Sequence, residues 1–146
     1  WDFNRAWTPN AMRHEVLAIM RDAQRFAGRC RPVLMLDLHA PGGFEDEGCY
    51  LFLPKAQDLP AAHRAARMVG ERLLTALGPD VHPQGFHTAS YWSRWSAPNA
   101  VDWFTRTIGC PAMTLEIPYQ GGRSGVFTID GYRAIGARLA DAAAAG

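Results

Sequence analysis

Two short apolar segments, each closed by an ionisable residue, constrain the fold of this chain more than any other feature. The segment 33–39 (VLMLDLH) ends in His39, and the segment 112–116 (AMTLE) ends in Glu116. A short run that is apolar on both faces is typical of an interior strand covered by helices. In open α/β sheets the ligand crevice lies beyond the carboxyl ends of the strands. We therefore expect His39 and Glu116 to project into one crevice.

Helical patterns surround these strands. Apolar residues recur every three or four positions in several segments, and Gly28, Gly78 and Gly109 follow three of them as stop signals. The sequence predicts helices that begin at Pro9, at Pro60, at Asn99 and after the capping residue Thr128, a second strand over 49–53, and an irregular segment over 79–98. This alternation of helices and strands indicates an α/β fold in one structural unit.

Composition excludes several classes of protein. The 146 residues, of which 48% are hydrophobic and 20% charged, suit one globular domain with a core. A formal net charge of +1 provides no field to attract nucleic acid or an anionic membrane, and no apolar run approaches the roughly 20 residues of a membrane span. Three scattered cysteines without CxxC spacing argue against a disulfide framework and a zinc ribbon. We expect neither nucleic acid nor a membrane as a partner.

Three motifs in order along the chain, DFNRAW, LDLHAP and TLEIPY, resemble the second half of the zinc carboxypeptidase family, peptidase family M14. The resemblance implies that Asn4 and Arg5 hold the terminal carboxylate of a substrate. It also implies that His39 is the last of three zinc ligands and that Glu116 is the general base. The implied fold is a three-layer α/β/α arrangement with a mixed, mostly parallel sheet, of the phosphorylase/hydrolase-like type.

The chain departs from the family at its beginning. The first two zinc ligands of the family come from an HxxE motif upstream of the Asn-Arg pair, and only three residues precede Asn4. We therefore interpret residues 1–146 as the C-terminal portion of a single catalytic domain, an incomplete half that needs the missing N-terminal half as its partner.

The residue types suit these roles for physical reasons, although each has a simpler alternative. Arg5 offers a planar fork that matches a carboxylate. Burial near Glu116 is expected to raise its pKa, which suits a general base, but an ion pair with Arg123 is the alternative. A lone histidine at a strand end is more often a hydrogen-bonded core residue than a zinc ligand. Asp37 either orients His39 or binds loop amides.

The resemblance also places two residues at substrate-contacting positions. The pair Asp102-Trp103 matches a pair in the pancreatic-type enzymes, and counting from it puts Arg94 where they carry a mobile tyrosine. Arg94 departs from that pattern and is a candidate for contact with an acidic substrate group. Alternatively, Tyr91 or Trp95 replaces the tyrosine, or this aromatic cluster packs onto the domain. Val101 falls at the specificity position, which implies an apolar or aromatic C-terminal substrate residue.

Three functions remain open. The first is a zinc-dependent metallocarboxypeptidase that removes a C-terminal residue from peptides. The second is an N-acyl amino acid amidohydrolase that resembles aspartoacylase, and the third is a non-catalytic module that binds peptide termini. The interval of 77 residues between His39 and Glu116 and the closing helix favour the first function over the second. The expected partner is a peptide or small amide substrate with a free carboxylate, and the expected cofactor is Zn²⁺.

Overall fold

The structure, a computed structural model, describes residues 3–8, 10, 13–41, 47–56, 58–87 and 98–145. The helices are α1 (His14–Ala27), α2 (Pro60–Leu77), α3 (Ala100–Trp103) and α4 (Ile129–Ala144). The strands are β1 (Met35–His39), β2 (Cys49–Phe52), β3 (Val81–His87), β4 (Ala112–Glu116), β5 (Gly121–Gly122) and β6 (Gly125–Val126). Three short helical segments complete the set: η1 (Phe3–Arg5), η2 (Gly78–Asp80) and η3 (Phe104–Ile108), the last a π-helical continuation of α3. No helix within these ranges is long and apolar enough to cross a membrane.

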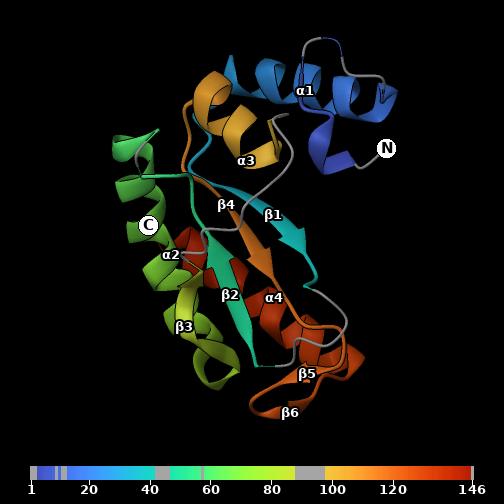
Figure 1. Ribbon diagram of the computed structural model, residues 1–146, viewed down its shortest axis with the longest axis vertical. Coiled ribbons are helices and arrows are strands. Elements are labelled where there is room, and N and C mark those ends of the chain that lie inside the picture. The colour runs from blue at the N-terminus through green and yellow to red at the C-terminus, as the bar shows by residue number, and fades with distance from the viewer. Residues whose placement is uncertain are drawn as a thin grey trace.

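A mixed, mostly parallel sheet of four strands forms the centre, in the order β1-β4-β2-β3 (Figure 1). The pairs β1 with β4 and β2 with β3 are parallel, whereas β2 and β4 are antiparallel. The predicted α/β class is therefore confirmed. The prediction of an interior position is wrong for β1 in this sheet, because β1 pairs with β4 alone among the described strands. The residues of β1 are apolar because helices pack on both of its faces, and not because a strand lies on each side of it.

Helices cover both faces of the sheet. In Figure 1, α4 passes behind the sheet, while α1 and α3 lie together at its upper end. One face packs with α2 and α4 into a cluster of wholly or nearly buried apolar residues: Cys49, Leu51, Ala66, Leu73, Leu77, Met113, Leu115, Ile135 and Leu139. A smaller cluster joins α1 and α3 to the chain start through Ala6, Trp7, Val16, Met20, Ala100 and Trp103, with Met35 of β1 packed against it. Since side chains alternate along a strand, every second residue of β1 and β4 lies on each face.

Several predicted boundaries are confirmed. Helix α2 begins at Pro60 and is followed by Gly78, and Gly109 ends the segment that starts with α3 in a left-handed conformation. Thr128 caps α4, because its hydroxyl oxygen accepts a hydrogen bond from the Gly131 amide at 3.1 Å. The predicted start of the first helix at Pro9 is wrong, since α1 begins at His14. Arg13, the residue before α1, has an extended conformation, and Pro9 lies outside the described residues.

The expected irregular segment over 79–98 contains a strand that the sequence did not indicate. Strand β3 spans Val81–His87 and includes Pro83 and Gly85, two residues that weaken any strand pattern. It lies at the edge of the described sheet, and its pairing with β2 shifts in register between Cys49 and Leu51. An edge position and an irregular ladder are the conditions under which a strand tolerates proline.

Candidate active site

The two strand-end residues singled out by the sequence are direct neighbours. In the parallel ladder of β1 and β4, His39 lies opposite Glu116, and the Ile117 amide donates to the His39 carbonyl oxygen at 3.0 Å. The His39 side chain is one-third exposed, whereas Glu116 is only 9% exposed. Both residues stand at the carboxyl ends of their strands and on the sheet face opposite Met113 and Leu115. The structure thus brings this predicted pair together.

Tyr50 is a third member of this row that sequence reasoning missed. In the antiparallel ladder of β2 and β4, Tyr50 lies opposite Glu116 and is buried. Its neighbours Cys49 and Leu51 belong to the apolar cluster on the other face, so Tyr50 shares the face of Glu116. The row across three strands is therefore His39, Glu116 and Tyr50. Only the strand order reveals it, because nothing in the local sequence says that β2 runs beside β4.

The beginning of the chain also reaches this place. Asn4 lies in η1, and its Nδ2 is 3.4 Å from Nε2 of His39, across 35 residues of sequence. The Oδ1 of Asn4 accepts a hydrogen bond from the Ala100 amide at 3.4 Å. Packing of Trp7 against Trp103, with ring centroids 5.8 Å apart, holds this segment next to α3. Asn4 therefore joins His39 and Glu116 at one end of the sheet.

Arg5 is half-buried beside Asn4 and folds back on its own turn. Its Nη1 donates to the backbone oxygen of Asn4 at 3.1 Å. The Nε of Arg5 is buried and has no hydrogen-bond acceptor within the described part of the chain. The Nε donor of Arg5 is therefore unsatisfied within the described residues.

The Asp37 carboxylate lies beside the His39 ring. Its Oδ2 lies 3.2 Å from Nε2 of His39, and Thr114, its partner across the ladder, also hydrogen-bonds to it. Burial raises the pKa of the Asp37 carboxyl, and the charge and hydrogen bond of His39 together with the Thr114 hydrogen bond oppose that rise. Residues 42–46 of the adjoining loop lie outside the described residues, so the alternative that Asp37 binds loop amides stays open.

Of the residues expected to contact a substrate side chain, the structure describes Val101. Val101 is only 4% exposed in α3, so little of its side chain is available to a ligand, and its specificity role stays a prediction. Arg94, Tyr91 and Trp95 lie in the segment 88–97, outside the described residues.

A zinc ion needs more ligands than this site offers. Structural and catalytic zinc sites take three or four protein ligands from His, Cys, Asp and Glu. Within the ranges that the structure describes, no group of three or more such residues could hold a metal ion. An imidazole backed by a carboxylate, as in His39 with Asp37, fits one ligand of such a site. The described residues can therefore contribute to a zinc site and do not complete one.

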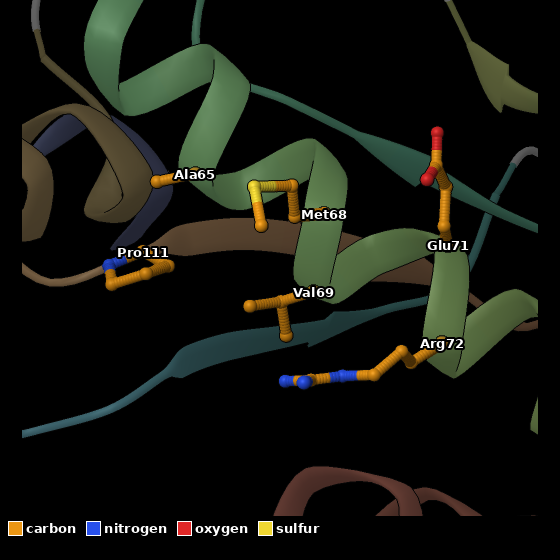
Figure 2. Close-up of a pocket in the computed structure, with 6 residues that line it drawn as sticks. All are labelled: Ala65, Met68, Val69, Glu71, Arg72 and Pro111. Atoms are coloured by element: carbon orange, nitrogen blue, oxygen red, sulfur yellow. The ribbon is translucent and has the colours of Figure 1, made fainter. Parts of the chain in front are cut away.

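A separate hollow lies beside α2, well apart from these residues. It measures about 480 Å³ and is lined by Ala65, Met68, Val69, Glu71, Arg72 and Pro111. Figure 2 shows Glu71 pointing away from the other side chains, and its carboxylate is 3.2 Å from Nε of Arg67. No residue of the His39 row lines this hollow, so it is not part of the candidate site.

Comparisons of the chain with protein-family models, curated proteins and solved structures found no match. The interpretation of the site depends on its own residues.

Proposed function

We propose that this chain is the C-terminal portion of the catalytic domain of a zinc-dependent metallocarboxypeptidase. The observation that carries the proposal is the pairing of His39 with Glu116 at the carboxyl ends of β1 and β4, with Asn4 in contact with His39. A metal ligand, a general base and a carboxylate-binding amide are three functions that peptide hydrolysis at a chain terminus requires. Asn4, His39 and Glu116 supply these three residue types, and although they are far apart in sequence they lie together at one end of the sheet.

Each residue has a distinct task in this proposal. A zinc ion held by His39 and further ligands would supply Lewis-acid polarisation of the scissile carbonyl and activation of water. Glu116 accepts the proton of the attacking water at a carboxylate oxygen and then passes it to the leaving amine.

Substrate recognition falls to Asn4 and Arg5. A terminal carboxylate that receives hydrogen bonds from the Arg5 guanidinium and the Asn4 amide would lie beside His39. The last peptide bond of the substrate is then the bond nearest to His39 and Glu116. This arrangement supports removal of a single C-terminal residue over cleavage within a peptide.

One observation favours a second candidate. Because the described residues supply one good zinc ligand and no group of three, a chain with no further ligands would bind peptide termini without cleaving them. The aspartoacylase-like alternative has no structural observation in its favour. The two remaining candidates differ in one measurable property, which is the zinc content of the complete protein.

The test joins the chain to its upstream half and measures bound zinc by elemental analysis in the wild type and in His39→Ala. We expect one zinc per wild-type molecule and a clear loss in the variant, since metal ligands have few substitutes. His14→Ala is a matched control, because His14 is an exposed residue at the start of α1. Equal zinc content in the wild type and His39→Ala would rule out the ligand assignment. A complete protein without zinc that still binds peptide acids would be the non-catalytic module.

A further inference from the structure

We propose that Asp37 positions His39 in the tautomer that carries its proton on Nε2, which leaves Nδ1 as the ring nitrogen free to accept a hydrogen bond or a metal ion. The two side chains are neighbours because residues two apart on a strand lie on the same face. Oδ2 of Asp37 lies 3.2 Å from Nε2 of His39. That oxygen is buried and has no well-aligned donor among the described residues. A proton on Nε2, brought into line by a small rotation of the ring, satisfies it.

The carboxylate is held in place for this task. Thr114 lies directly opposite Asp37 in the ladder of β1 and β4, is buried, and hydrogen-bonds to the Asp37 carboxyl. Asp37 is therefore fixed from the strand on one side and faces His39 on the other. Carboxylates that bind the second nitrogen of a metal-ligating histidine act in this way, since they fix both the tautomer and the ring orientation.

A second neighbour of Nε2 favours the opposite tautomer, with the proton on Nδ1. Nδ2 of Asn4 is 3.4 Å from the same nitrogen, and an amide NH₂ group can only donate. The amide orientation is set independently, because Oδ1 of Asn4 accepts from the Ala100 amide. Nε2 can either donate to Asp37 or accept from Asn4. The contact with Asp37 is shorter and involves a charged acceptor, so it prevails over a longer contact between neutral groups.

Asp37 has a positioning role, since it acts on any ligand only through His39. The tautomer itself can be tested whether or not the chain ever binds zinc. The consequence for metal binding rests on the proposed function, because a proton on Nδ1 would have to be displaced before that nitrogen could coordinate. The two ideas can accordingly fail separately.

The chain contains its own references for both tautomers. Nδ1 of His63 is 2.7 Å from the Pro54 carbonyl oxygen, which can only accept, so His63 carries a proton on Nδ1. His82 shows the reverse, because its Nδ1 accepts from the Gln84 amide at 3.1 Å and its Nε2 donates to Glu47 at 2.9 Å. These two residues give opposite patterns in long-range proton–nitrogen correlation spectra. His39 can be compared with both in one sample.

The experiment records such spectra on this 146-residue chain without metal, with His39→Gln to assign the signals of His39. We expect the His39 pattern to match that of His82 and to differ from that of His63. A wild-type spectrum with the His39 proton on Nδ1 would overturn the proposal, and this outcome requires no variant to fold.

Two variants identify the residue responsible. In Asp37→Ala the remaining neighbour of Nε2 is the Asn4 amide, so the proton should move to Nδ1. In Asn4→Ala the carboxylate remains, and the proton should stay on Nε2. An unchanged tautomer in folded Asp37→Ala, or a switched one in Asn4→Ala, contradicts the assignment.

In the complete protein, Asp37→Ala is also expected to weaken zinc binding by about 10- to 100-fold. The expected tautomer in a complete protein that binds no zinc would refute the proposed function and leave the role of Asp37 intact.

Discussion

The two faces of the sheet are built from the same strands, but one carries apolar core residues and the other carries the polar residues of the candidate site. In β4, Met113 and Leu115 pack into the apolar cluster under α2 and α4, while Thr114 and Glu116 lie on the opposite face. In β1, Leu36 packs against that apolar cluster, and Asp37 and His39 share the other face. Strand alternation alone produces this division. The apolar core residues and the polar residues of the candidate site thus occupy alternate positions of two five-residue segments.

The comparison also predicts how the two faces tolerate change. On the apolar face, each buried methylene group stabilises the folded state. A buried carboxylate destabilises the folded state unless it is paired and hydrogen-bonded. Substitutions on the apolar face should therefore lower the free energy of unfolding, and substitutions on the polar face should mainly change activity.

The largest effect is expected from Glu116→Gln in the complete protein. Removing the proposed general base should lower kcat by about 10²- to 10⁴-fold, while zinc content and stability change little. Peptide hydrolysis and urea unfolding measured together provide the check. Glu71→Gln, at an exposed position of α2, is the matched control. Turnover close to that of the wild type would show that Glu116 has a structural role, and the two faces would then not differ as stated.

On the apolar face, Leu73→Ala should lower the free energy of unfolding by about 2 to 5 kcal/mol, because it leaves a cavity in a close-packed cluster. Leu73 is fully buried in α2. Its control is Met68→Ala on the same helix, at a side chain that is 71% exposed, where a change within about 0.5 kcal/mol is expected. Equal losses for the two variants, measured by urea unfolding, would contradict the assignment of this face as the stabilising one.

An intermediate effect is expected for Arg5→Lys, which keeps the charge and loses the planar fork. In the complete protein the preference for a free-acid peptide over its C-terminal amide should fall by about 10- to 100-fold, as expected for one or two charge-assisted hydrogen bonds. The measurement is kcat/KM for matched acid and amide peptides, and Arg29→Lys at an exposed site is the control. If the wild type cleaves free-acid and amidated peptides equally well, the proposed carboxypeptidase function is excluded.

The smallest effect concerns the thiols. All three cysteines are free, Cys30 is exposed, and Cys49 is buried in the apolar cluster. Burial raises the pKa of Cys49 to about 12, so its reactive thiolate is scarce in the folded chain until the pH rises well above its ordinary value of 9.0. Alkylation at about pH 8, followed by mass spectrometry, should label Cys30 at least about tenfold faster than Cys49. Similar rates would mean that the apolar face opens readily.

Part of this architecture was accessible from sequence. The strand ends at His39 and Glu116, the start of α2 at Pro60 and the Thr128 cap follow from local periodicity and capping chemistry. These features depend on residues within a few positions of one another. They could be predicted because the physical signals are short in range.

The rest depends on contacts between distant segments. The approach of Asn4 to His39 requires Trp7 to dock on Trp103, and the place of Tyr50 beside Glu116 requires the strand order. Strand β3 was missed because Pro83 weakens the pattern, and pairing with β2 compensates for it. No local pattern carries this information.

The unpaired edge of β1 has a consequence for the behaviour of the protein in solution. Within the described residues its outer backbone groups have no strand beside them, and Leu38 and Val33 nearby are 64% and 70% exposed. A bare edge with apolar side chains is a template for another chain, and neither proline nor lysine interrupts it. The 146-residue chain should therefore self-associate through this edge as its concentration rises. Leu38→Lys, which places a charge on the edge, should raise the concentration at which association begins.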